Sequence, residues 1–289
     1  MRVEITRSLD EDVVLWRYMA LDKFINLFSD ECLYFASLES YSKSDPMEGF
    51  PPKAVLKIIY DVYRQDFSDT ANFLDFMEAQ PGADVEQVRL AIAKARAMID
   101  AMPNEFKIRA EKIFKGTVVS CWYASNHESE AMWKLYSDLG KGIAVKTTVG
   151  RLKKALEVGG EKSGDRLIYI GKVKYIDFQR DEFEPGECVV DGHVSPLLKR
   201  KSFEHENEVR AFFVGDIDVE NVNTFQPVSH QVKVDIKELI EDIYISPFAS
   251  GSFSNAVRSI ASRFGFEIEL KNSSLLSEAK GVWDFLERE

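Results

Sequence analysis

The chain has 289 residues, of which 45% are hydrophobic and 29% charged, and its formal net charge is −11. This length is ample to bury a core, and the composition excludes long intrinsically disordered stretches. Because an acidic chain repels phosphate backbones, we expect no general nucleic-acid affinity.

Sequence features also bear on the compartment. No stretch approaches the ~18 consecutive apolar residues of a membrane span, and the N-terminus lacks the apolar centre of a signal peptide. Cys32, Cys121 and Cys188 are odd in number and far apart, which is typical of buried free thiols rather than of a disulfide framework. The sequence therefore predicts a cytoplasmic protein with no membrane association.

The first elements form a short unit. Residues 13–19 are rich in β-branched and aromatic residues and predict a strand. Residues 22–28 carry hydrophobic residues at helical spacing, and residues 32–37 predict a second strand. A strand, a short helix and a strand make a compact opening unit.

Residues 51–115 change in character to helix. Val55, Ile58, Ile59 and Val62 recur at the spacing of an amphipathic helix, and a second such stripe follows a Pro-Gly turn. We expect this segment to form a helical insertion between β segments.

The remaining elements alternate between strand and helix. This pattern predicts an α/β (α+β) fold, with a mixed, mostly antiparallel sheet, flanking helices and the helical insertion, in a single domain that comprises residues 1–289. Strands are expected at 117–122, 142–146, 167–175, 206–214, 242–246 and 266–270, helices at 129–139 and 252–264, and a surface loop at 181–194.

The strongest local signal for chemistry lies at residues 203–213. In a strand, alternate residues share a face, so Glu206, Glu208 and Arg210 would lie in a row. Two neighbouring carboxylates repel, which keeps one ionised and raises the pKa of the other, and Arg210 offsets part of the repulsion. Such a row suits acid–base or cation-stabilising chemistry, and it also fits a solvated strand face.

Three other features each have a structural reading. Asp45 precedes a proline, which favours a type I turn. Trp133 and Tyr136 stand three apart on one helical face, where they would pack in a core or stack on a base. The basic patches 151–154 and 199–201 are typical of solvated helix ends.

Known motifs of metal and nucleotide sites do not occur. The four histidines are scattered without zinc-type spacing, and neither a phosphate-binding loop nor a dinucleotide fingerprint is present. We therefore expect no bound metal ion.

A set of short motifs points to a family. Taken together, they resemble the bacterial domain-of-unknown-function family twenty-nine seventy-one from about residue 13 to about residue 270, and that family implies no activity. The motifs are, in chain order, W-R-Y at 16–18, L-Y-F-A-S at 33–37, D-P-M-E at 45–48, S-C-W at 120–122, M-W-K-L-Y at 132–136, G-I-A-V at 142–145 and F-E-H-E-N-E-V-R at 203–210.

More remotely, the order of the basic strand, the Tyr-Phe-x-Ser strand and the Glu-x-Glu segment resembles the split-sheet ADP-ribosyltransferases. This resemblance implies an enzyme that binds NAD and transfers ADP-ribose to an unknown target, in a toxin or phage-defence role. It implies that Arg17 holds the dinucleotide phosphates, and that Glu208, with Glu206, stabilises the oxocarbenium-like state or deprotonates the acceptor.

Two sets of site residues follow from this resemblance and from the local patterns. The expected catalytic residues are Glu208, Glu206 and Arg210. The expected NAD-binding residues are Arg17, Tyr18, Tyr34, Ser37, Asp45, Glu48, Trp133 and Tyr136.

Two alternatives stay open. In a Mg²⁺-dependent nuclease or phosphoesterase, Asp45, Glu48, Glu206 and Glu208 would supply oxygen ligands, and Lys201 would neutralise a phosphate. In a non-enzymatic ligand-sensing or interaction module, the charged segment would be a binding surface.

The spatial arrangement separates the enzyme from the module. Convergence of Arg17, Ser37, Glu206 and Glu208 in one cleft would favour an enzyme, and dispersal of these residues in solvated positions would favour the module.

Overall fold

Ten strands form one mixed, mostly antiparallel sheet in the computed structural model, which describes residues 1–80, 86–137, 140–160, 166–184, 186–215, 226–265 and 270–276. The strands are β1 (Arg2–Ile5), β2 (Val14–Ala20), β3 (Cys32–Ser37), β4 (Thr117–Ala124), β5 (Gly142–Thr148), β6 (Leu167–Lys172), β9 (Glu208–Val214), β10 (His230–Lys233), β11 (Asp242–Ile245) and β12 (Leu270–Asn272). Only the β1–β6 and β11–β12 pairs of this sheet are parallel among the described strands. A separate parallel pair joins β7 (Lys174–Ile176) to β8 (Leu198–Arg200).

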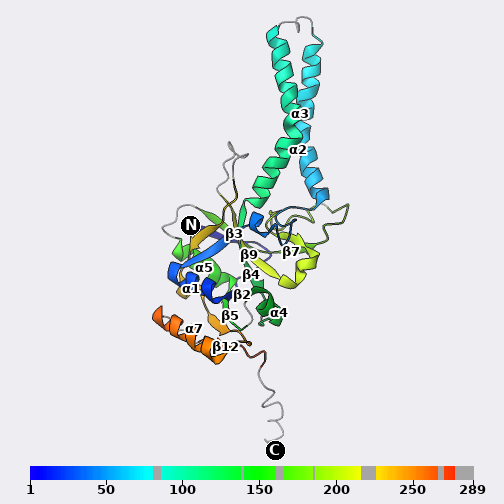
Figure 1. Cartoon of the computed structure of the whole chain (residues 1–289). Helices are drawn as coiled ribbons and strands as arrows, with labels where there is room; N and C mark the ends of the chain where they lie inside the picture. The colour runs from blue at the N-terminus through cyan, green and yellow to red at the C-terminus, as the bar shows by residue number, and fades with distance from the viewer. Residues whose placement is uncertain are drawn as a thin grey trace, which may run out of the picture.

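The helices flank this sheet, so the expected fold class is confirmed (Figure 1). They are α1 (Leu21–Asp30), α2 (Lys53–Glu78), α3 (Glu86–Lys115), α4 (Glu130–Tyr136), α5 (Val149–Gly159), α6 (Ile236–Leu239) and α7 (Gly251–Arg263), with the short 3₁₀ helices η1 (Leu38–Tyr41) and η2 (Lys201–Glu206).

The sheet forks at β4. On one edge, β4 pairs with β9 along nearly its whole length. On its other edge, β2 pairs with the end of β4 at Tyr123 and Ala124, and β3 pairs with its beginning at Val118 and Val119. One branch continues from β2 through β5, β11 and β12, and the other continues from β3 to β10.

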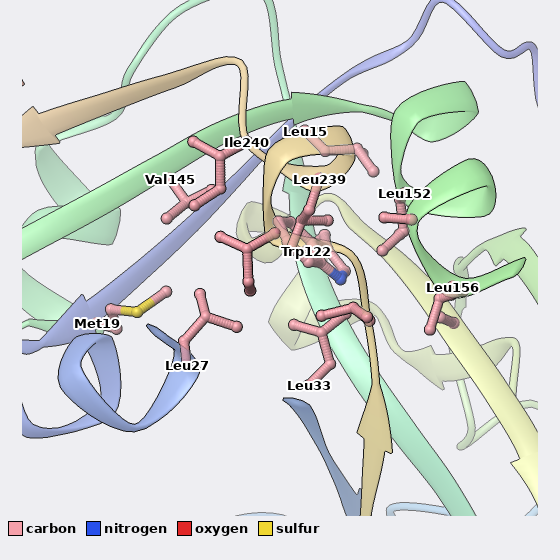
Figure 2. Close-up of a cluster of buried hydrophobic side chains, with 14 of the residues drawn as sticks. Leu15, Met19, Leu27, Leu33, Trp122, Val145, Leu152, Leu156, Leu239 and Ile240 are labelled. Atoms are coloured by element: carbon pink, nitrogen blue, oxygen red, sulfur yellow. The ribbon is translucent and has the colours of Figure 1, made fainter. Parts of the chain in front are cut away.

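One face of the sheet carries the large hydrophobic core. Val209, Ala211 and Phe213 of β9 point into it, and helices α1, α5, α6 and α7 cover it. Figure 2 shows Leu152 and Leu156 of α5 gathered with other aliphatic side chains around Trp122. The alternate residues of β9, Glu208 and Arg210, point to the opposite face, because successive strand residues alternate.

Some element boundaries differ from the expectations. The strand expected at 206–214 begins at Glu208, because Asn207 adopts a left-handed conformation with φ of 36° and ends η2. The strand expected at 167–175 is divided into β6 and β7. Residues 266–269 and 138–139, at the ends of two other expected elements, lie outside the described residues.

Residues 51–115 are largely helical, as expected. Helices α2 and α3 form a long hairpin that projects away from the sheet (Figure 1). We call this hairpin the arm.

Candidate active site

Five charged side chains meet on the face of the sheet opposite the large core, and we call them the carboxylate cluster. Each of the five is at most 9% exposed. They come from four parts of the chain: the turn after η1, strand β8, the last residue of η2 and strand β9. The members are Glu48, Lys199, Glu206, Glu208 and Arg210.

Arg210 joins two of the carboxylates. Its Nε donates to Glu208 Oε2 at 2.6 Å, and its Nη1 donates to Glu48 Oε1 at 2.9 Å and to the Pro196 carbonyl at 3.0 Å. The guanidinium is almost fully buried, at 1% exposure. A planar fork of donors suits such a two-carboxylate bridge.

Lys199 lies among all three carboxylates. Its Nζ donates to Glu208 Oε1 at 2.6 Å and to Glu206 Oε2, and it lies 3.5 Å from Glu48 Oε2. Three carboxylates and two cations leave one excess negative charge when all five groups are ionised. Because a buried net charge is costly, the cluster favours the uptake of one proton.

That proton belongs on Glu206. Burial, and then the neighbouring Glu208 carboxylate, raises the pKa of Glu206 to about 7. Burial alone would also raise the pKa of Glu208, but Arg210 and Lys199 outweigh it and hold that pKa well below its ordinary value. The pKa values of the two carboxylates are therefore shifted in opposite directions. Glu208 is kept ionised, and Glu206 is able to exchange a proton near neutral pH.

Tyr136 connects this pair to solvent. Its hydroxyl donates to Glu206 Oε1 at 2.6 Å, and its side chain is 48% exposed. Burial and the bond to Glu206 raise the pKa of Tyr136, so the phenol stays protonated. Glu206 and Tyr136 thus form the outer edge of the cluster, whereas Glu208 and Arg210 form its interior.

Replacing Glu206 with glutamine should change how stability depends on pH. The folded protein binds the Glu206 proton more tightly than the unfolded chain, so this contribution is complete below the ordinary pKa of 4.5 and is lost as the pH rises to about 7. Glutamine is neutral throughout, so the variant should gain stability relative to the wild type as the pH rises between those values, by about 3 kcal/mol in all.

Thermal unfolding of both proteins across this pH range measures the effect. The matched control is Glu204→Gln, which removes a carboxylate from an exposed position of the same 3₁₀ helix. A stability difference between wild type and Glu206→Gln that does not vary with pH would contradict the proton assignment.

Asp45 and Glu48 belong to one turn beside the cluster. As expected for an Asp-Pro turn, the Asp45 carboxylate accepts a hydrogen bond from the backbone N–H of Met47 at 3.0 Å. It also pairs with Arg200 at 2.6 Å. Since Arg200 follows Lys199 directly, β8 binds this turn through Asp45 and Glu48 together.

Arg17 lies on the other face of the sheet. Its Nη1 donates to Ser120 Oγ at 2.5 Å, and its guanidinium lies 5.4 Å from the ring centre of Trp122. Ser120 is paired with Ala211, and paired residues of neighbouring strands point to the same face. Ala211 belongs to the large core, so the sheet separates Arg17 from Glu208 and Arg210.

The contacts of Arg17 link the two branches of the sheet at the fork. Its Nη2 donates to the Tyr34 carbonyl at 3.4 Å, so the guanidinium bridges β3 and β4 where β2 and β3 diverge. Burial lowers the pKa of Arg17. No ion pair joins Arg17 to an acidic side chain within the described part of the chain.

The other expected NAD-binding residues are dispersed. The Tyr34 side chain is 53% exposed, whereas Ser37 is buried and its backbone N–H donates to Ser229 Oγ at 3.2 Å. Tyr18 and Trp133 pack edge to face at 4.9 Å, and Trp133 is fully buried. The structure therefore gathers Glu48, Tyr136 and the three expected catalytic residues, and it places Arg17, Tyr34 and Ser37 elsewhere.

Sequence reasoning missed Lys199 as a member of the site. The basic patch 199–201 was expected to be a solvated helix end, which is wrong for Lys199, a buried residue of β8. A signal was present in the sequence, because the carboxylates of the 203–210 motif exceed its own cations and need another one when buried. Tyr175 was also missed; its hydroxyl accepts a hydrogen bond from the Glu208 backbone N–H at 2.9 Å.

Two cavities of the structure lie away from the cluster. The structure describes a cavity of about 320 Å³ between α2 and α3 and one of about 120 Å³ beside η1 and the end of α3. In the described ranges, no three His, Cys, Asp or Glu side chains are grouped to hold a metal ion. None of the described helices is both long enough and apolar enough to cross a membrane.

Comparison with known proteins finds a family match over part of the chain. Residues 132–211 match the family model described as "Protein of unknown function (DUF2971)", which confirms the expected resemblance for the motifs at 132–136, 142–145 and 203–210, whereas the four earlier motifs lie outside the match. The matched segment begins in α4 and ends within β9, so it contains Lys199, Glu206, Glu208 and Arg210. No curated protein and no solved structure matches the chain.

Proposed function

We propose that the protein is an enzyme of glycosidic-bond chemistry, an ADP-ribosyltransferase-like protein that takes NAD as its substrate. The observation that carries this proposal is the carboxylate pair, in which the pKa of Glu206 is raised to about 7 while that of Glu208 is lowered. Pairs of acidic groups with divergent pKa values mark the acid–base residues of glycoside chemistry.

Each carboxylate has a separate role in this reaction. As the bond between the ribose anomeric carbon and the nicotinamide nitrogen breaks, the electron pair leaves with nicotinamide and positive charge develops on the sugar. The ionised Glu208 stabilises that charge electrostatically from the interior of the cluster. Deprotonated Glu206, at the outer edge, accepts the proton of the acceptor nucleophile as its new bond to the anomeric carbon forms.

Release of nicotinamide from NAD tests this proposal. Purified wild-type protein should release nicotinamide, and Glu206→Gln should lower the rate by about 100-fold, because a positioned acid–base group contributes about 10²–10⁴. The matched control, Glu204→Gln, should keep the wild-type rate. A wild type that releases no nicotinamide, in water or with cell extract as the source of acceptor, would overturn the proposal.

A second candidate is the non-enzymatic ligand-sensing or interaction module. The observation in its favour is the separation of Arg17 from the carboxylate cluster by the sheet, because one ligand on the cluster side does not contact both. For this candidate, ligand binding would raise the melting temperature of the wild type and of Glu206→Gln equally, without nicotinamide release.

The Mg²⁺-dependent alternative receives no support from the geometry. Lys199 Nζ and the Arg210 guanidinium lie between the carboxylates and already balance two of their charges. A toxin or phage-defence role, with a cytoplasmic location, stays part of the proposed function, since modification of a target by ADP-ribose would serve it.

A further inference from the structure

The arm carries a stripe of exposed apolar side chains on the outside of α2. Ile58, Val62, Phe73 and Phe76 are between 59% and 68% exposed. At 3.6 residues per turn, the four fall within an arc of about 60° and extend over about 27 Å of the helix. We call these four residues the outer stripe.

The outer stripe is distinct from the contact between α2 and α3. Tyr60 and Tyr63 mark the side of α2 that faces α3, since their rings lie 5.0 Å and 5.3 Å from that of Phe106. That side is about 145° around the helix from the outer stripe. Helix α2 is therefore apolar on two opposite sides, and such a helix is usually buried on both.

The pattern of apolar and polar residues along this side of α2 is nearly symmetric about its centre. Between the two apolar pairs, the same side carries Gln65 and Asp69, both exposed. The order along the helix is two aliphatic residues, Gln65, Asp69 and two phenylalanines. When two copies of α2 run antiparallel, Ile58 lies opposite Phe76 of the other copy, Val62 opposite Phe73, and Gln65 opposite Asp69.

We propose that the outer stripe binds the same stripe of a second copy of this chain, with the two α2 helices antiparallel. A two-fold axis brings the same patch of both copies together, so each contact between two apolar residues occurs twice in the dimer. The Gln65 amide donates to the Asp69 carboxylate of the other copy on both sides of the axis. A polar pair at the centre of an apolar seam fixes the register of the two helices.

Repulsion between like charges disfavours the parallel arrangement. A parallel pair in register would place Asp69 opposite Asp69, whereas the antiparallel pair places each Asp69 opposite the Gln65 amide of the other copy.

The mass of the full-length protein in solution tests the dimer. Light scattering coupled to size-exclusion chromatography should give twice the chain mass of 33.0 kDa for the wild type. Phe73→Asp should halve the measured mass, because it places four like charges at the seam. The matched control is Leu90→Asp, which changes a residue of α3 that is 71% exposed, and it should stay dimeric.

Cross-linking tests the orientation. In an equimolar mixture of Ile58→Cys and Phe76→Cys, oxidation should produce mainly the disulfide between the two different variants, whereas either variant alone should cross-link poorly. The wild type, with its three native cysteines, provides the background. A monomeric wild type, a dimer that Phe73→Asp leaves intact, or efficient cross-linking of Ile58→Cys with itself would each overturn the proposal.

Discussion

Replacing Arg210 with methionine should lower the free energy of unfolding by about 4 kcal/mol, because removal of one partner leaves buried carboxylates without their counter-charge. Methionine is long enough to fill most of the space of the arginine stem, so the loss reflects charge rather than a cavity. Glu48 and Glu208 would each lose a hydrogen bond of 2.9 Å or less. Chemical denaturation at neutral pH measures the change.

A second substitution tests whether the loss of stability comes from uncompensated charge rather than from any change at position 210. Adding Glu208→Gln to Arg210→Met removes the uncompensated charge and should recover part of the lost stability. Arg2→Met, at a side chain that is 76% exposed in its ion pair with Glu4, should change the stability by less than about 0.5 kcal/mol. If the double variant were less stable than Arg210→Met, the electrostatic explanation would be wrong.

Replacing Trp122 with alanine should also cost about 4 kcal/mol, since it removes the largest side chain near the centre of the main core and leaves a cavity (Figure 2). Trp122 is 1% exposed and lies against aliphatic residues of α5 and β2. The melting temperature and the urea midpoint of unfolding report this loss.

The phenylalanine variant is the informative comparison. The Trp122 indole N–H is buried without a hydrogen-bond partner in the described part of the chain, so its removal sacrifices no bond. Trp122→Phe should therefore cost less than half as much as Trp122→Ala. Leu135→Ala, at a side chain that is 58% exposed, serves as the control and should have little effect. Equal losses for Trp122→Phe and Trp122→Ala would contradict the cavity argument.

Local patterns predicted much of the fold and part of the site. The alternation in the 203–213 segment correctly placed Glu208 and Arg210 together on one face of a strand. It did not predict the break at Asn207, whose side chain binds the Ala124 carbonyl of a distant strand. A bond of that kind depends on tertiary packing, which the local sequence does not encode.

The sequence by itself determined the mixed α/β class, the helical character of residues 51–115 and the proximity of Glu206 to Glu208, because hydrophobic periodicity and short spacing are local properties. Only the tertiary structure decided that Lys199 lies among the carboxylates and that Arg17 lies on the opposite face of the sheet. Both outcomes follow from strand register and from the fork at β4, where pairing between residues far apart in the chain determines which side chains meet.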